Sequence, residues 1–135
     1  QIFINDKAWD TVEYLNNQYD QYAVTNGSKI AQDAKVANSG LDKIFKKVFI
    51  SENIGYDKPY KEFFDLVFED IGSARRDEYI LIGDSLTSDM RGANNAGIRN
   101  IWYNPHAKKN QLDVKLDYTI HTLDEVPAIL EKLND

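Results

Sequence analysis

The feature that most restricts how this chain can fold is a series of short apolar runs without polar alternation. Segments with apolar residues at helical spacing separate one run from the next. Strands buried on both faces have this pattern, whereas strands of a half-exposed antiparallel sheet alternate. The pattern predicts an α/β, three-layer Rossmann-like fold, in which helices cover both faces of a parallel sheet. The expected strands are residues 22–24, 48–50, 79–82, 101–103 and 118–120.

Start and stop signals delimit the helices between these runs. Pro59 suits the first turn of a helix that has a strongly aromatic face. Thr87 or Ser88 is expected to begin a helix that ends at Gly97, and Thr122 with Glu125 resembles a capping box. Because Pro127 lacks an N–H, the first turn of that last helix is expected to be irregular. The expected helices are residues 6–19, 28–41, 59–71, 87–97 and the segment after 122.

Size and charge restrict the possible partners. A chain of 135 residues is expected to form one domain over residues 1–135. Its net charge of −6 argues against a nucleic acid polymer or an anionic membrane as the main partner. It has no cysteine for a disulfide or a thiolate metal site, and no apolar run of membrane-spanning length. We therefore expect a cytoplasmic protein that binds a small molecule.

Polar residues follow directly after several of the expected strands. The carboxyl ends of parallel strands meet at one edge of a sheet, and ligands bind at that edge. We therefore expect these side chains to converge on one pocket. They are Thr25, Asn26, Gly27, Lys58, Asp84 and Asp89.

These residue types are the components of a site for a phosphate group and Mg²⁺. The Thr25 hydroxyl and the turn amides that follow it can bind phosphate oxygens, and the Lys58 ammonium can neutralise them. Asp84 and Asp89 offer the oxygen ligands that a hard cation prefers, and the cation binds the remaining charge of the phosphate. The expected partner is a small phosphorylated metabolite, and the expected cofactor is Mg²⁺.

Each component also has a simple structural explanation. Asn26-Gly27 is a common turn pair, and a lysine such as Lys58 in a polar loop is usually solvated. Asp84 after a glycine can be a turn residue, and Asp89 in a first helical turn stabilises the helix dipole by ~0.3–1 kcal/mol. The functional interpretation depends on the convergence of the groups and not on any single residue.

The ordered motifs resemble those of a known family. TNGS after a short strand, KP before an aromatic helix, and GDSLTSDMRGANNAGI are similar to the second, third and fourth motifs of the haloacid dehalogenase (HAD) superfamily of phosphohydrolases. Their order and spacing, with the following WYNPH, most resemble the pyrimidine 5′-nucleotidase branch. The resemblance extends from about Trp9 to the C-terminus.

The resemblance implies an Mg²⁺-dependent phosphatase acting on a small phosphomonoester such as a nucleoside 5′-monophosphate. It implies that Thr25, Asn26 and Gly27 bind the phosphoryl group and that Lys58 neutralises its oxygens and the nucleophile. Asp84 would be the inner-sphere Mg²⁺ ligand, and Asp89 a second acid near the metal that acts through water.

The chain departs from the family pattern at its beginning. Enzymes of this family start with a strand carrying Asp-x-Asp-x-Thr/Val, which supplies the nucleophile and the general acid, and this motif is absent. Asp6, Asp10 and Asp20 are not preceded by a run that the sequence identifies as a strand. The first residues instead resemble the segment that returns from the family's inserted cap. The sequence therefore predicts a C-terminal part without nucleophile or cap, inactive alone, whose aspartyl-phosphate would form outside this chain.

The missing strand has a structural consequence. In the family it lies between the strand that ends at Thr25 and the strand that precedes Asp84. Open strand edges leave buried amides and carbonyls without partners, at about 1–3 kcal/mol each. We expect a missing N-terminal segment to fill the gap, or self-association through it, or direct pairing of the two strands.

Two other functional classes remain open. A phospho-receiver domain also places Asp, Thr and Lys at the edge of a parallel sheet, but there the acids come first in the sequence. A non-catalytic α/β binding or assembly module could keep the frame without the chemistry, and the sequence upstream of Gln1 would distinguish it from an enzyme.

Overall fold

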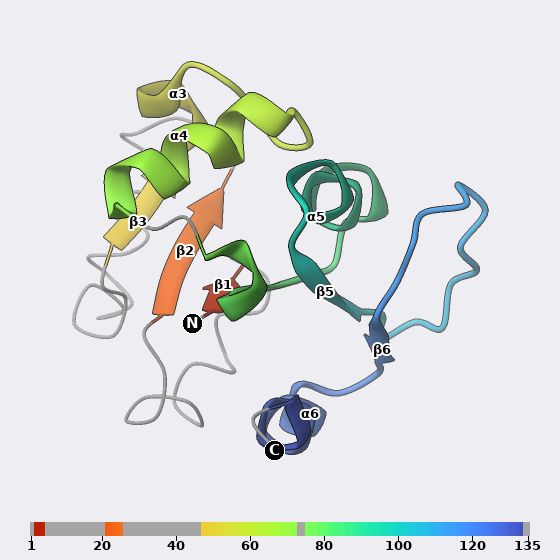
Figure 1. Cartoon of the computed structure of the whole chain (residues 1–135). Coiled ribbons are helices and arrows are strands. Elements are labelled where there is room, and N and C mark those ends of the chain that lie inside the picture. The colour runs from red at the N-terminus through yellow and green to blue at the C-terminus, as the bar shows by residue number, and fades with distance from the viewer. Residues whose placement is uncertain (1, 5–20, 26–46, 73–74, 134–135) are drawn as a thin grey trace, which may run out of the picture.

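The computed structural model describes residues 2–4, 21–25, 47–72 and 75–133. They form a six-stranded sheet in the order β3-β2-β1-β4-β5-β6, and each neighbouring pair of strands is parallel (Figure 1). The predicted parallel α/β architecture is confirmed. The strands are β1 Ile2–Ile4, β2 Gln21–Thr25, β3 Lys47–Ile50, β4 Ile80–Gly83, β5 Arg99–Tyr103 and β6 Tyr118–Ile120.

Helices and helical turns connect the strands. The expected helices at residues 6–19 and 28–41 lie outside the described residues. The α-helices are α3 Ser51–Ile54, α4 Lys61–Ile71, α5 Arg91–Ala96 and α6 Val126–Leu133. Short 3₁₀ turns occupy Arg76–Glu78 and Leu123–Glu125, and a π-helical turn occupies Leu86–Met90.

The middle of the sheet differs from the sequence prediction. We expected a gap between β2 and β4, but β1 lies there and pairs with both strands. Ile2 to Ile4 align with Gln21 to Ala23 on one side and with Ile80 to Ile82 on the other. Direct pairing of β2 with β4 is therefore wrong, and so is the expectation that no strand precedes Asp6. A run of only three apolar residues gives a weak sequence signal, but two neighbouring strands that need backbone partners are enough to order it.

Two hydrophobic clusters cover the opposite faces of the sheet. In Figure 1, α4 and α5 lie on one side and α6 lies on the other. Because side chains alternate along β4, Leu81 packs toward α4 and α5 whereas Ile80 and Ile82 pack toward α6. The α6 cluster contains Ile80, Ile82, Ile101, Ile120, Val126 and Leu130, and the α4/α5 cluster includes Val24, Phe49, Phe63, Phe64, Val67, Leu81 and Ala93.

Several helix ends refine the sequence prediction. α4 begins at Lys61 after the N-cap Tyr60, so Pro59 precedes the helix instead of lying in its first turn. The helical segment before Gly97 is capped by the Ser85 side chain, which accepts a hydrogen bond from the Ser88 amide, and not by Thr87 or Ser88. Gly97 ends α5 with φ of 72°, as predicted.

The last helix confirms both parts of its prediction. Thr122 and Glu125 form a capping box, and the first turn is 3₁₀ before α6 continues from Val126. Pro127 therefore lies at the start of α6, where its missing N–H costs least.

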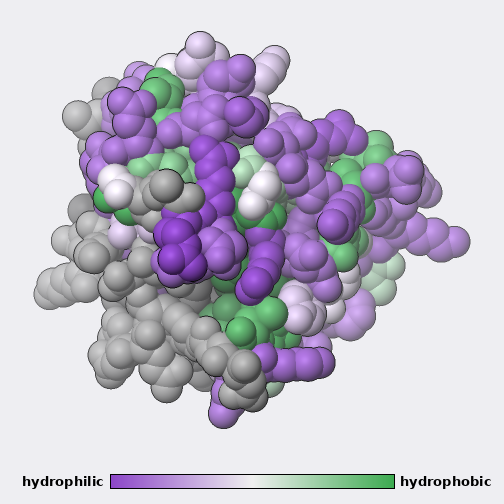
Figure 2. Space-filling view, in the orientation of Figure 1, coloured by the Kyte–Doolittle hydropathy of each residue, from purple (hydrophilic) through white to green (hydrophobic). Residues whose placement is uncertain are grey.

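The surface in view is largely hydrophilic where the structure describes it (Figure 2). A hydrophobic patch lies near the lower middle of this view. Among the described helices, none has the length and apolar character required to cross a membrane.

Candidate functional site

A buried ion pair lies at the carboxyl edge of the sheet. The Lys58 Nζ and the Asp89 Oδ1 are 2.5 Å apart, and their side chains are 1% and 0% exposed. The same ammonium donates a hydrogen bond to the Val24 carbonyl oxygen over 3.2 Å. Lys58 therefore connects the end of β2 with the turn that follows β4. A lysine in a polar loop is usually solvated, so the simple structural explanation of Lys58 does not hold.

The close approach of Asp89 depends on Gly83. A Cβ atom added at Gly83 would lie 2.6 Å from Asp89 Cγ and closer still to Asp89 Oδ2. Real Cβ atoms do not approach other atoms so closely. The last residue of β4 therefore leaves the space that the Asp89 carboxylate occupies.

The turn after β4 holds the carboxylate from the other side. The Ser85 amide lies 3.3 Å from Asp89 Oδ2, and the Ser85 hydroxyl accepts a hydrogen bond from the Ser88 amide over 3.1 Å. Asp89 and Met90 donate their amides to the Ser85 carbonyl. The loop thus closes on itself around Asp89, with one carboxylate oxygen facing Lys58 and the other facing the backbone.

Asp84 is the first residue after β4, and it is half-buried. Its carbonyl oxygen accepts a hydrogen bond from the Trp102 indole Nε1 over 3.0 Å. Since Asp84 and Asp89 belong to the same turn, both acids of the GDSLTSD motif lie at the edge where Lys58 arrives. The structure therefore brings Lys58, Asp84 and Asp89 to one region, as the sequence predicts.

The predicted phosphate-binding residues are only partly described. Thr25 is the last residue of β2 and pairs in register with Ile50, so its backbone lies at the same edge, directly after the carbonyl that Lys58 contacts. Asn26 and Gly27 lie outside the described residues. The predicted roles of Thr25, Asn26 and Gly27 in phosphate binding remain predictions.

The residues at this edge suit a hard cation only in part. Asp84 offers a carboxylate, and no cysteine occurs in the sequence. In the part of the chain that the structure describes, no group of three or more His, Cys, Asp or Glu side chains could hold a metal ion. Mg²⁺ usually keeps several water ligands and is bound by one or two carboxylates together with phosphate oxygens. The donor set is therefore compatible with Mg²⁺ if water and substrate complete the coordination.

Three residues that shape the site were not predicted. Gly83 directly follows the expected strand 79–82 and received no role, Ser85 also received none, and Trp102 was placed in the expected strand 101–103 without a role in the site. Gly83 contributes through its lack of a side chain, Ser85 through its cap on the following helical turn, and Trp102 through its indole N–H. Only the glycine beside the two acids gave a local signal that could have been used.

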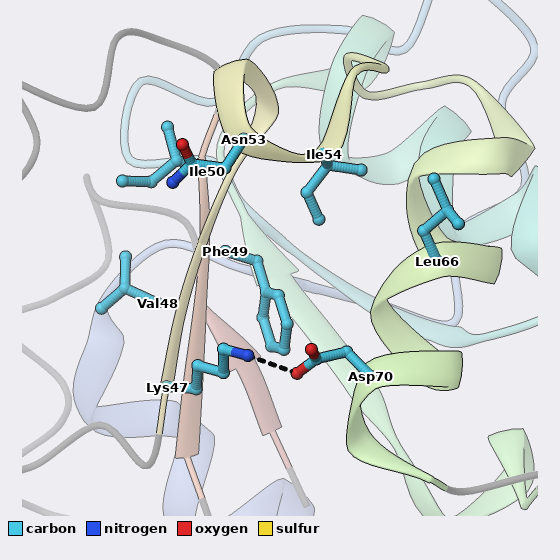
Figure 3. Close-up of a pocket in the computed structure, with 8 residues that line it drawn as sticks. All are labelled: Lys47, Val48, Phe49, Ile50, Asn53, Ile54, Leu66 and Asp70. Carbon is cyan, nitrogen blue, oxygen red and sulfur yellow. Dashed lines mark hydrogen bonds and ion pairs between the residues drawn. The ribbon is translucent and has the colours of Figure 1, made fainter.

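A separate pocket lies at the edge of the sheet that β3 forms, between β3, α3 and α4 (Figure 3). Its volume is about 370 Å³, and at one side Lys47 and Asp70 point toward each other. None of Lys58, Asp84 and Asp89 lines it. Its lining residues are Lys47, Val48, Phe49, Ile50, Asn53, Ile54, Leu66 and Asp70.

Known proteins with similar sequences belong to one family of hydrolases. Residues 1–97 match the family model described as haloacid dehalogenase-like hydrolase. YfnB of Bacillus subtilis, named as a HAD-hydrolase, is 41% identical over 125 residues, which are 93% of this chain and 53% of YfnB. The pyrimidine 5′-nucleotidase PynA of Streptococcus pneumoniae is 38% identical over 118 residues, which are 87% of this chain and 50% of PynA.

The solved structures give the same result. A crystal structure of YfnB bound to magnesium superposes with a TM-score of 0.86 at 41% identity, over 93% of this chain and 55% of that one. This chain therefore spans about half the length of the relatives it matches.

Proposed function

Because this chain belongs to the haloacid dehalogenase-like hydrolases, we propose that it supplies the phosphate- and Mg²⁺-binding part of a phosphatase for small phosphomonoesters. The observation that carries the proposal is the buried Lys58–Asp89 pair at the carboxyl edge of the sheet, beside Asp84. We further propose a nucleoside 5′-monophosphate as the substrate class, supported by the similarity to PynA, which is named a pyrimidine 5′-nucleotidase.

Lys58 provides positive charge for the phosphoryl group. Its ammonium has the Val24 carbonyl and Asp89 Oδ1 within hydrogen-bonding distance, so its position is set before substrate arrives. A cation held in place in a water-poor site stabilises the charge of a transferring phosphoryl group without reorganisation. Asp89 then acts first as the group that positions Lys58. Its second role near the metal, expected from the sequence, is part of this proposal.

Asp84 and Asp89 are the residues that would hold Mg²⁺. When bound, Mg²⁺ neutralises phosphate charge and orients the phosphoryl group. Asp84 is proposed as the direct ligand. Asp89 Oδ1 faces Lys58, so Asp89 would reach the ion through water.

The proposed reaction proceeds through an aspartyl phosphate. A carboxylate oxygen attacks phosphorus, the P–O bond to the alcohol breaks, and the alcohol leaves with a proton from a general acid. Water then attacks phosphorus and releases phosphate and the free carboxylate. The sequence predicts that this nucleophile lies outside the chain, and the described residues assign no group to the role.

Calorimetry with Mg²⁺ and orthophosphate tests the binding part of this proposal. We expect Mg²⁺ to bind weakly to the wild-type chain and not detectably to Asp84→Asn, because the substitution removes the ligand charge. Phosphate binding in the presence of Mg²⁺ should be lost in Lys58→Met. Equal heats for wild type and Asp84→Asn would show that Asp84 is not a metal ligand.

A phosphatase assay tests the position of the nucleophile. With p-nitrophenyl phosphate or uridine 5′-monophosphate and Mg²⁺, we expect no steady phosphate release by this chain alone. Steady release that disappears in Asp84→Asn would show that the chain contains the nucleophile.

The cytoplasmic location and the single domain over 1–135 stay predictions. Self-association also stays a prediction, although β1 fills the gap from which it was argued.

A further inference from the structure

Trp102 lies directly beside the turn that carries the two acids of the site. In the β4–β5 ladder it is in register with Gly83, the residue before Asp84. Trp102 is buried, with 4% of the residue exposed, and its indole Nε1 donates a hydrogen bond to the Asp84 carbonyl over 3.0 Å. An aromatic side chain from the neighbouring strand therefore contacts the backbone of the proposed Mg²⁺ ligand.

The side chain of Trp102 lies on the same face of the sheet as Asp89. Ile82 and Ile101, one position earlier in the same register, both pack toward α6. By the alternation along strands, Gly83 and Trp102 face the other way. On that face the missing side chain of Gly83 admits the Asp89 carboxylate. Gly83 thus leaves space for the Asp89 carboxylate, and the Trp102 indole binds the backbone of Asp84.

The indole ring is also fixed by packing. Trp102 forms a small cluster with Met90 and Val114, and Leu86 and Leu116 pack against it. Met90 and Leu86 belong to the turn after β4, and Val114 and Leu116 to the segment between β5 and β6. Because the ring is held on several sides, its N–H has a defined direction, as a positioning group requires.

We propose that Trp102 is a positioning residue that fixes Asp84 for metal binding through the hydrogen bond from its indole N–H to the Asp84 carbonyl. The proposal rests on the proposed function, because it assigns Asp84 as the Mg²⁺ ligand. Packing alone would require only a large apolar ring at position 102. The distinguishing feature is the N–H, which Trp102→Phe removes while an aromatic ring remains.

The neighbouring aromatic residue provides a matched control. Tyr103 is the next residue of β5 and packs against the α6 cluster on the opposite face. Tyr103→Phe also changes one polar atom of an aromatic side chain, but away from the turn. We expect Tyr103→Phe to bind Mg²⁺ as wild type does and Trp102→Phe to bind it about three- to tenfold more weakly, the range expected for one lost hydrogen bond.

Two measurements on the full chain test the proposal. Calorimetry gives the Mg²⁺ affinity of wild type, Trp102→Phe and Tyr103→Phe, with the unfolding temperature measured alongside. In ¹H–¹⁵N spectra, the Trp102 indole signal should move as Mg²⁺ is added to the wild-type chain. The sequence has two tryptophans, so this signal is assigned as the indole signal that remains in Trp9→Phe. The same signal should not move in Asp84→Asn. This second measurement needs no substitution at position 102, so it decides even if Trp102→Phe folds poorly.

The outcomes separate this proposal from the proposed function. Mg²⁺ binding by Trp102→Phe within twofold of wild type, or an indole signal that does not respond to bound Mg²⁺, overturns the positioning role. If wild type and Asp84→Asn show the same heats, the metal assignment itself fails. In that case, amide hydrogen exchange of residues 85–90 tests whether Trp102 positions this turn. Faster exchange in Trp102→Phe than in wild type supports the positioning role, and unchanged exchange overturns it.

Discussion

Two lysine–aspartate pairs with the same separation lie in different surroundings in this molecule. Lys58 and Asp89 are 2.5 Å apart with side chains 1% and 0% exposed. Lys47 and Asp70 are also 2.5 Å apart, but their side chains are 51% and 45% exposed. The first pair connects β2 to the turn after β4, and the second connects β3 to α4 beside the pocket in Figure 3.

The difference shows that distance alone does not measure the importance of an ion pair. Water screens the exposed pair, and such pairs contribute about 0–1 kcal/mol to the free energy of unfolding. The buried pair has lost its hydration, so the removal of one partner exposes the full cost of a buried charge. A buried ion pair is weak evidence for a stabilising role, because desolvation of the two charges offsets their attraction. We therefore interpret the burial of Lys58 as part of its proposed function.

The largest expected effect is that of Asp89→Asn. The substitution keeps the shape of the side chain but removes the charge that faces a buried ammonium. We expect the free energy of unfolding to fall by about 3 kcal/mol, as for other buried pairs that lose one partner. Urea denaturation followed by circular dichroism measures this change.

The exposed pair supplies the control for that experiment. Asp70→Asn removes the same charge at the same distance from a lysine, and we expect a loss below about 0.5 kcal/mol. Equal losses of unfolding free energy for the two substitutions would show that burial does not set the cost of removing one partner. The double variant Lys58→Met/Asp89→Leu should recover most of the stability lost in Asp89→Asn, because the buried charge is then absent.

An intermediate effect is expected for Gly83→Ala. The added methyl group would overlap the Asp89 carboxylate and force it away from Lys58. We expect a loss of about 1–3 kcal/mol in the free energy of unfolding, typical of overpacking. Thermal unfolding tests the cause if Gly83→Ala is made both in the wild type and in Asp89→Ala. In the Asp89→Ala background the added methyl group should cost little, because the carboxylate that it would meet is already absent.

Gly92→Ala serves as its control. A Cβ at Gly92 would have Phe64 Cε2 as its nearest neighbour, at 3.1 Å. Gly92 lies inside α5, where alanine favours the helix by up to about 1 kcal/mol and offsets a tight contact. We expect almost no change, and a loss as large as that of Gly83→Ala would show that the site has no special demand for glycine.

The smallest effect concerns the pH dependence of a half-buried pair. Arg76 lies 2.7 Å from Asp65, and this hydrogen bond to the guanidinium lowers the pKa of Asp65 below its usual value of 3.8. A lowered pKa in the folded state stabilises the protein at pH values above the unfolded pKa, and this contribution is lost as the pH falls through the folded pKa. We expect Asp65→Asn to remove about 0.5 kcal/mol at pH 6 and almost nothing at pH 2.

Salt sharpens this last comparison. At 1 M NaCl the difference between wild type and Asp65→Asn at pH 6 should shrink, because salt screens a pair that is partly open to solvent. The effect of Asp89→Asn should change little, since salt screens a pair with side chains 1% and 0% exposed much less than an exposed pair. An Asp65 contribution that is unaffected by salt would contradict the assignment to an ion pair that is open to solvent on one side.

The sequence predicted the strands from 21 to 120 well because their signals are local. Val48–Ile50 and Ile101–Tyr103 are apolar runs, and each was placed within two residues of the observed strands Lys47–Ile50 and Arg99–Tyr103. The capping box of Thr122 and Glu125 also depends on residues that are close in sequence. Such features need no knowledge of the rest of the fold.

From the sequence alone, the site could be predicted only as a set of residues at the carboxyl edge of the sheet. The order Thr25, Lys58, Asp84, Asp89 along the chain indicated which residues converge. It did not indicate that Lys58 faces Asp89, since that contact joins residues 31 positions apart. Two acids were available to the lysine, and local sequence contains no preference between them.

What the sequence by itself determined is the α/β architecture, the family and the edge of the sheet that carries the chemistry, because periodicity and motif order are properties of short segments. Only the tertiary structure decided that Ile2–Ile4 fills the middle of the sheet, that Gly83 makes room for Asp89 and that the Trp102 indole reaches the Asp84 carbonyl. Each of these depends on backbone partners or free volume supplied by distant segments. Such contacts exist only once the strands have been brought side by side.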